Sequence, residues 1–322
     1  MSSNDSSSKA TVPVVAAVEK KEGDHKTKKH TPMQHTIASQ GAGAFATIFF
    51  FPFDTVKMRF MSQDGTKQRM HNNHNYNSTF KSLVEIRATE GLRSLYRGSA
   101  TAIAGSMTAW GSYMFLYRTL NSKYVTDDEF FAKAGVSAIA SVASSSISTP
   151  IFLIKTRMQV EDRSGAGGPT HYTTFSESLK HILKTSGARS LWRGFSAQCL
   201  LAIPNAFNLP IYDALKKHRM QVTRKEELDM HEVLGCTLVT KTTLLLISHP
   251  LFVLKTRLQD HRSNLGDVKY LNVVDSVKTI LKREGVKGLY RGTAPALVQA
   301  VPRSITHFFV YEALLKLQKH YY

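Results

Sequence analysis

The sequence has little cysteine and little acid, and small or polar residues interrupt its apolar stretches. Only two cysteines occur among 322 residues, Cys199 and Cys236, which excludes a disulfide framework and a cysteine-based zinc site. Lys and Arg number 42 against 24 Asp and Glu, so the net charge of +18 favours anionic partners such as nucleic acid, anionic lipid or a phosphorylated solute. The mean hydropathy of −0.20 argues mildly against an ordinary membrane protein.

Signatures of catalysis and metal binding are also missing. The sequence has no glycine-rich phosphate loop, nucleophile elbow or cluster of metal ligands. We therefore expect neither an enzyme nor a metal site, and no resident cofactor. Residues 1–34 are polar and rich in Ser and Lys, and acids at positions 5, 19, 22 and 24 spoil the pattern of a transit peptide. We expect this segment to be a disordered tail.

One pattern of residues occurs three times along the chain. A proline is followed by Lys five residues later and Arg seven residues later, at Pro52, Pro150 and Pro250, which are 98 and 100 residues apart. A second motif recurs in phase with the first and ends in aromatic-Arg-Gly. Its three copies span residues 90–98, 186–194 and 284–292. Two motifs that keep register predict three tandem repeats of about 100 residues each.

Each repeat has the same predicted anatomy. An apolar stretch rich in small residues precedes the proline, at 39–51, 135–149 and 234–249. A polar loop with a short amphipathic helix follows, at 78–89, 174–185 and 272–283. A second long helix comes after the aromatic-Arg-Gly motif, at 99–120, 195–216 and 293–317. The sequence thus predicts an all-α membrane protein with six transmembrane helices, since about 20 residues suffice to cross a bilayer.

Two other classes of protein are alternatives to this prediction. Six amphipathic helices could form a soluble bundle, but the helices carry apolar runs such as 48–53 and 243–247 among Gly, Ala and Ser, which allow close packing in a membrane. Polar residues on one face suit a water-filled cavity. A nucleic-acid binder would show a basic stripe with exposed aromatic side chains. Here the basic residues recur at fixed repeat positions beside apolar spans, so we expect no nucleic-acid partner.

The tripled motifs resemble those of the mitochondrial carrier family over residues 35–318. The family pattern is Pro-x-acid-x-x-base-x-base on odd-numbered helices and aromatic-base-Gly before even-numbered ones. The resemblance implies a three-fold pseudosymmetric bundle, with short helices on the matrix side and repeats at 35–125, 126–222 and 223–322. It also implies a monomeric, multi-pass protein of the mitochondrial inner membrane. Such a protein moves a solute through a central site by alternating access between a matrix gate and a cytosolic gate.

The proline motif itself indicates how a matrix gate would close. Proline kinks a helix and brings the three odd-numbered helices together, so that acids and bases of neighbouring helices can pair. Only the first repeat supplies the acid, Asp54, whereas Phe152 and Phe252 occupy the other two acidic positions. By the family's pairing order Asp54 would contact Lys155.

The remaining lysines of this gate, Lys57 and Lys255, are expected to lack partners. A weak gate would follow, supported by Gln159 and Gln259, which lie two residues beyond the arginines. The alternative is that the two phenylalanines close the gate by packing.

The cytosolic gate of the family is an aromatic-acid-x-x-base pattern on even-numbered helices. Only the second repeat matches it fully, with Asp213 and Lys216, while Glu312 is followed by Leu315 at the basic position. The first repeat has Arg118 where the acid is expected. We expect this gate to open readily. Alternatively, these charges are interfacial anchors.

The aromatic-Arg-Gly elements lie where helices begin, and a helix N-terminus attracts phosphate. By resemblance these positions bind cardiolipin, whose headgroup suits basic pockets between helices. The alternative is that each glycine only makes the turn. The expected lipid-binding residues are Arg97, Gly98, Arg193, Gly194, Arg291 and Gly292.

Solute contacts in the family lie midway along the even-numbered helices, which corresponds here to Gly105, Leu200 and Gln299. These three residues carry no charge, which disfavours small di- and tricarboxylates. Lys241 and Arg303 are the charges expected inside the bundle, and a charge within a membrane helix indicates function. The alternatives are that Lys241 snorkels and that Arg303 faces a neighbouring helix.

Local segments resemble the folate/FAD subgroup of the family, namely 57–65, 105–113 and 257–261. The two charges at Lys241 and Arg303, together with Trp110, would suit a large planar anion, which they could bind by ion pairing and aromatic stacking. Gln299 departs from the arginine expected there, and residues 200–212 resemble the subgroup little. The expected solute is therefore FAD or folate, and the alternative is NAD or a pyrimidine or adenine nucleotide.

Overall fold

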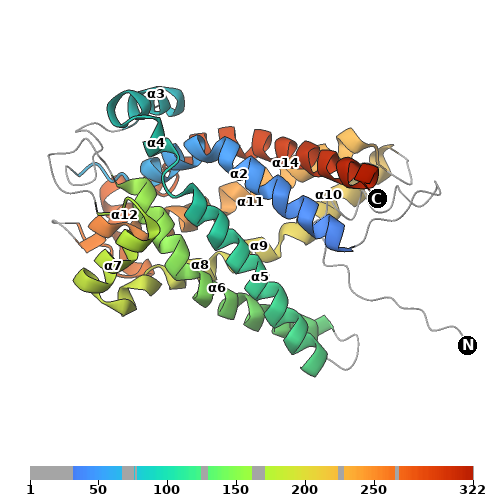
Figure 1. Cartoon of the computed structure of the whole chain (residues 1–322), viewed down its shortest axis with the longest axis horizontal. Coiled ribbons are helices and arrows are strands. Elements are labelled where there is room, and N and C mark those ends of the chain that lie inside the picture. The colour runs from blue at the N-terminus through green and yellow to red at the C-terminus, as the bar shows by residue number, and fades with distance from the viewer. Residues whose placement is uncertain are drawn as a thin grey trace, which may run out of the picture.

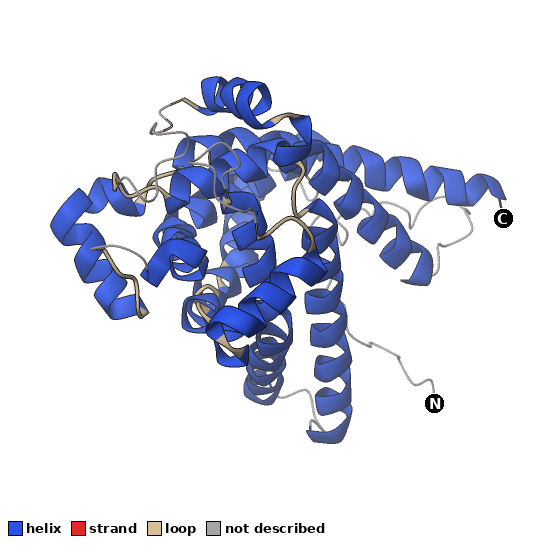
Figure 2. Cartoon of the chain, turned by 60° about the vertical axis from the view of Figure 1, so that its left-hand side comes forward, coloured by secondary structure: helices blue, strands red, loops and turns tan. Residues whose placement is uncertain are grey.

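The structure, a computed structural model, describes residues 32–66, 76, 78–124, 130–161, 171–223, 228–264 and 268–321. Helices make up every regular element of these residues (Figure 2). The predicted tail at 1–34 lies almost entirely outside them. Five long helices are continuous, and they are α2 (Pro32–Ser62), α5 (Ser99–Tyr124), α6 (Phe130–Val160), α11 (Met230–Gln259) and α14 (Thr293–Tyr321).

The fourth long helix was predicted as one piece over 195–216, and this prediction is wrong. Three helices occupy its place: α8 (Phe195–Leu200), α9 (Ala202–Ala206) and α10 (Asn208–Thr223). The breaks follow Leu200 and Ala206, which are the residues four positions before Pro204 and Pro210. Proline has no N–H to donate to the carbonyl four residues earlier. A single proline leaves α2, α6, α11 and α14 continuous, whereas two prolines only six residues apart accompany the two breaks here.

Between the long helices of each repeat lie short ones, as predicted. They are α3 (Thr79–Glu90) with α4 (Leu92–Leu95), α7 (Phe175–Ser186) with η3 (Ala188–Trp192), and α12 (Val273–Glu284) with α13 (Val286–Leu289). Side chains cap two of them, because Thr174 and Asn272 accept hydrogen bonds from the main chain of Glu177 and Asp275. A further short helix, η4 (His261–Asn264), follows α11.

The long helices pack in three pairs, α14 with α2, α5 with α6 and α10 with α11 (Figure 1). Because the last helix packs on the first, the bundle closes on itself. Helices α2, α6 and α11 also contact one another. The pairs diverge from the end that carries α3, α7 and α12, which we call the motif end because the three proline motifs lie toward it (Figure 1).

Small residues bring the paired helices close together. Ser144 on α6 donates to the main-chain oxygen of Ala109 on α5 at 2.6 Å, and its hydroxyl lies 2.9 Å from that of Ser112. On the other side of the bundle, Ala38 and Ala42 of α2 pack under residues of α14. Helix pairs of this kind are typical of membrane bundles, in which close van der Waals packing replaces the hydrophobic effect.

Two of the described helical segments are long and apolar enough to cross a membrane by length and composition, Gly135–Val160 and His231–Gln259. Each of α2, α6 and α11 continues through its proline for about three further turns. The proline motif therefore lies inside a helix, and the residues that follow it project into the convergence of α2, α6 and α11.

Candidate functional site

Asp54 is the centre of an ion-pair cluster where the three odd-numbered helices converge. Lys155 Nζ on α6 lies 2.7 Å from Asp54 Oδ2, the pairing expected from the sequence. Lys57 was expected to lack a partner, and this is wrong, because its Nζ lies 2.9 Å from Asp54 Oδ1. Positions three apart on a helix face the same side, so the one carboxylate binds two ammonium groups.

The two glutamines at this end have different roles. Gln159 donates from Nε2 to Asp54 Oδ2 at 3.2 Å and thus supports the carboxylate from α6. Gln259 accepts a hydrogen bond from Thr156 Oγ1 at 3.1 Å and so joins α11 to α6. Both contacts cross between helices.

Phenylalanine occupies the acidic positions of the second and third repeats. Lys255 Nζ lies 5.2 Å from the centroid of the Phe152 ring. Gly105 lies against the same ring, because a Cβ added to Gly105 would lie 3.2 Å from Phe152 Cε1. Phe252 is 38% exposed, which does not fit a packed plug. Of the two phenylalanines, only Phe152 therefore packs against gate residues in the way the packing alternative requires.

A ring of three buried arginines lies two residues beyond these lysines, and the sequence did not predict it. The last carbonyls of a helix have no intrahelical partner. Each arginine Nε donates to such a carbonyl near the end of the next odd-numbered helix: Arg59 to Gln159 (3.2 Å), Arg157 to Gln259 (3.2 Å) and Arg257 to Met61 (3.1 Å). The ring joins α2 to α6, α6 to α11 and α11 to α2.

Carboxylates complete this ring in two repeats only. Both oxygens of Glu90 accept from Arg59, and both oxygens of Glu284 accept from Arg257. The corresponding residue of the second repeat is Ser186. Arg157 keeps only the tyrosine contact that all three arginines make, to Tyr172 Oη at 3.2 Å. The sequence signal was available, because an acid precedes the first glycine of the second motif in the first and third repeats and not in the second.

Histidines and a tyrosine surround Arg157 outside the long helices. The rings of His171 and His181 stack with centroids 4.1 Å apart, and Tyr172 lies 5.1 Å from His261. Burial lowers the pKa of His261 to about 4, although the neighbouring Asp260 carboxylate opposes this shift. Burial and the nearby His171 also lower the pKa of His181. The surroundings therefore favour the neutral imidazole of His181 and of His261.

We expect the stability of the protein to fall as the pH is lowered from about 6.5 to about 4. In this window the unfolded chain binds a proton at residue 261 that the folded chain does not bind, so protonation favours unfolding. His261 is 23% exposed, and its contribution is therefore about 2 kcal/mol, less than its full pKa shift would give. Thermal unfolding of the wild type and of His261→Gln across this range measures it. An equal loss of stability in both proteins would contradict the assignment.

The two charges expected inside the bundle lie where α11, α14 and α2 meet. Lys241 Nζ on α11 lies 3.1 Å from Ser304 Oγ on α14. Arg303 Nη2 on α14 donates to Thr47 Oγ1 on α2 at 2.9 Å. The two cations are close enough to repel each other, and in the described part of the chain no carboxylate pairs with either. Gln299, one turn before Arg303, is buried and donates to the main-chain oxygen of Phe50 at 3.2 Å.

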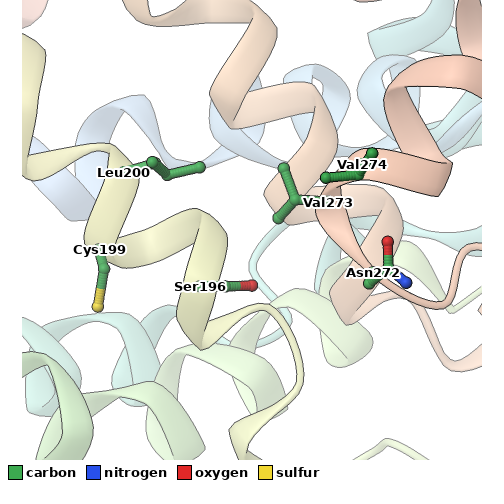
Figure 3. A pocket seen from close by; sticks show the side chains of 6 residues that line it. All are labelled: Ser196, Cys199, Leu200, Asn272, Val273 and Val274. Atoms are coloured by element: carbon green, nitrogen blue, oxygen red, sulfur yellow. The ribbon is translucent and has the colours of Figure 1, made fainter.

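The other expected solute contacts lie apart from this pair of charges. Trp110 is 53% exposed and meets Tyr113 edge to face at 6.2 Å. Leu200 lines an apolar pocket between α8 and the start of α12 (Figure 3). Gly105 contacts Phe152, near the lysines. Among the described residues, no hydrogen bond, ion pair or ring contact joins Gly105, Trp110 or Leu200 to Lys241 or Arg303.

Comparison with known proteins decides the family. The sequence profile described as "Mitochondrial carrier protein" matches residues 28–128, 126–223 and 226–322. The chain belongs to the mitochondrial carrier family. Members of this family are transporters, and the carrier's three repeats correspond to the three matched segments.

Relatives of the carrier differ in their named solutes. It is similar to "Folate transporter 1, chloroplastic" of Arabidopsis thaliana, at 31% identity over 88% of this chain and 96% of that protein. It is 26% identical to the mitochondrial FAD carrier protein of Saccharomyces cerevisiae, over 88% and 97% of the two chains. Nicotinamide adenine dinucleotide transporter 2, mitochondrial, of Arabidopsis thaliana is also 26% identical, over 87% and 78%. The name of the folate transporter places that relative in the chloroplast, whereas the other two are named as mitochondrial.

The charges expected at the cytosolic gate of the carrier do not meet in the structure. Asp213 is exposed on α10, Lys216 lies one turn later, and Glu312 lies on α14. Within the described ranges no ion pair or hydrogen bond links these three side chains. The lack of contact between these charges agrees with the helix pairs, which diverge away from the motif end.

The aromatic-Arg-Gly elements of the carrier do make turns. Gly98, Gly194 and Gly292 have φ angles of +82°, +78° and +83°, a region in which residues other than glycine are strained. The arginines beside them contact protein groups. Arg97 lies 3.6 Å from Glu161, Arg193 donates to the main-chain oxygen of Tyr270 at 3.3 Å, and Arg291 lies 3.7 Å from Glu284.

Proposed function

We propose that the carrier moves a large anionic cofactor-type solute, FAD or folate, across the mitochondrial inner membrane by alternating access. The observation that carries the proposal is the meeting of Lys241 and Arg303 between three helices, with no carboxylate partner for either cation among the described residues. An unpaired cation inside a membrane bundle is costly unless an anion binds it. The solute supplies that anion.

Six transmembrane spans are part of this proposal. Every one of the six long elements carries a large apolar side chain that is more than half exposed. These side chains are Phe49, Phe115, Ile139, Ile203, Ile247 and Phe309. Exposed apolar groups distributed around the whole bundle favour a surrounding of lipid. The fourth span would consist of α8, α9 and α10.

Alternating access follows from the difference between the two ends. At the motif end, which we assign to the matrix side, Asp54 joins Lys57 and Lys155 and closes the bundle. At the other end the helix pairs diverge (Figure 1). The conformation is then the one open to the cytosolic side, and solute binding would supply the differential free energy that opens the matrix gate.

Lipid binding at the helix starts is a further part of the proposal. One pocket is lined by Arg97, Gly98 and the start of α7, and the pocket of Leu200 joins the starts of α8 and α12 in the same way (Figure 3). Each lies between the N-terminus of a long helix and that of a short helix of the next repeat. Helix N-termini bind phosphate, so the pocket that Arg97 lines suits the headgroup of cardiolipin. The pocket of Leu200 is apolar and has no basic side chain in its lining.

FAD and folate are favoured over other solutes by the named relatives and by the residues that resemble the folate/FAD subgroup. The second candidate is NAD or a pyrimidine nucleotide, since relatives with those names match at 25–26% identity. All of these solutes are large and anionic. Their size and negative charge agree with the two neighbouring cations, Lys241 and Arg303, and with the uncharged residues at 105, 200 and 299.

Uptake into liposomes that contain the purified carrier tests the proposal. We expect FAD or folate to enter liposomes preloaded with the same solute, and protein-free liposomes to take up neither. The same assay with NAD and with nucleoside di- and triphosphates tests the second candidate. Uptake of only NAD or nucleotides would contradict the FAD or folate assignment while leaving the transport function standing.

A further inference from the structure

The matrix end of the carrier has more positive charge than its single carboxylate balances. Lys57, Lys155 and Lys255 occupy equivalent positions in the three repeats, and Asp54 pairs with the first two. Three ammonium groups and one carboxylate leave two positive charges in excess. Desolvated like charges repel strongly, so this excess must be offset by water or by an anion.

Lys255 is the lysine without a partner. Its Nζ lies over the Phe152 ring at 5.2 Å, where the family pattern has an acid. In the described part of the chain this ammonium group donates no hydrogen bond and makes no ion pair, while Lys57, Lys155 and Asp54 act on it electrostatically. A ring face attracts a cation, but it leaves the three N–H donors of lysine unused.

The unpaired lysine continues a line of cations that begins at the proposed solute site. Arg303 is near enough to act electrostatically on Lys155, and it acts in the same way on Lys241. Lys241 and Lys255 both lie on α11, and their separation of fourteen residues corresponds to about 21 Å along a helix. The line therefore extends from the middle of the bundle to its closed end.

We propose that Lys255 is a second anion-binding residue of the solute site. This inference rests on the proposed function, and it adds a selectivity: the carrier favours elongated solutes with two or more negative groups over small or singly charged anions. One negative group is bound by Lys241 and Arg303, and another reaches Lys255 at the closed end. Phe152 makes this possible because it leaves Lys255 free, whereas an acid would hold it in an ion pair.

Three variants test the assignment. Lys255→Gln removes the charge, Phe152→Asp gives Lys255 an internal partner, and Lys255→Arg keeps the charge. The exposed Lys278→Gln on α12 is the matched control. Binding of FAD, folate, NAD and ADP is measured by the thermal shift of the purified carrier, and KM and kcat are measured by uptake of each probe that the wild type binds.

We expect Lys255→Gln and Phe152→Asp each to weaken binding and to raise KM by about tenfold, the factor for one lost charge-assisted contact. Lys255→Arg and Lys278→Gln should keep wild-type values. Unchanged KM with a lowered kcat would overturn the inference, because Lys255 would then act only on gate opening. If Lys241→Ala loses binding and Lys255→Gln does not, the role of Lys255 is contradicted and the proposed solute site at Lys241 still stands. If neither variant loses binding, the proposed solute site fails with it.

Discussion

Replacing Lys241 with alanine is expected to reduce solute uptake to the level of protein-free liposomes while the carrier stays folded. The lysine is exposed within the bundle, and its hydrogen bond to Ser304 is the contact that the structure gives its ammonium group. The variant therefore loses little packing. It does lose one of the two cations that meet between α11 and α14. A hydrogen bond between a charged side chain and the solute would contribute about 1.5–3 kcal/mol to the free energy of binding.

Two matched variants separate the charge from the hydrogen bond. Lys241→Arg keeps the charge and should retain measurable uptake. Ser304→Ala removes the partner of Lys241 and leaves the ammonium group in place, so its uptake should stay near that of the wild type. Thermal unfolding in detergent checks that each variant is folded. Wild-type uptake by Lys241→Ala would exclude this residue from the solute site.

Changing Glu284 to serine is expected to destabilise the carrier by about 3 kcal/mol, since removing one partner of a buried ion pair leaves the other charge uncompensated. Both oxygens of Glu284 accept from the fully buried guanidinium of Arg257. The substitution copies the second repeat, in which Ser186 occupies this position. Thermal or denaturant unfolding of the purified carrier measures the loss.

The reciprocal substitution has the opposite expected effect. Ser186→Glu would give Arg157 the carboxylate that Arg59 and Arg257 already have, and it should raise the midpoint of thermal unfolding. Ser186→Gln is the control, because it adds a similar volume without the charge. An unfolding midpoint of Glu284→Ser equal to that of the wild type would show that the main-chain carbonyls and the Tyr270 hydroxyl suffice to hold Arg257.

The repeats predicted the arrangement of helices but not the break in the fourth one. Two motifs in register located the short helices and the starts of α5, α8 and α14 to within a few residues, because proline, glycine and capping residues act locally. The predicted stretches 39–51, 135–149 and 234–249 cover only the middle of α2, α6 and α11, which continue ten or eleven residues further. Pro204 and Pro210 were also visible in the sequence. The three-fold repeat predicts a continuous helix in this segment, whereas its two closely spaced prolines each remove a helical hydrogen bond.

The candidate site was only partly predictable, for two physical reasons. Asp54 and Lys155 could be identified from the repeated proline motif, and Lys241 and Arg303 could be identified because charges within an apolar helix are rare. The arginine ring could not be, since its acceptors are main-chain carbonyls, which every residue has. Counting along a repeat located Leu200, and the local resemblance of residues 105–113 located Trp110, but neither could give the direction of these side chains.

The arginine ring has a consequence for how this end of the carrier can diversify. Its bonds end on the main chain of Met61, Gln159 and Gln259, so no particular side chain is required at the accepting positions. The ring therefore holds the ends of α2, α6 and α11 together independently of residues 54, 152 and 252. Substitutions at those three positions can therefore change which ligands the closed end binds without unfolding it. The stability of this end and its ligand selectivity can change separately.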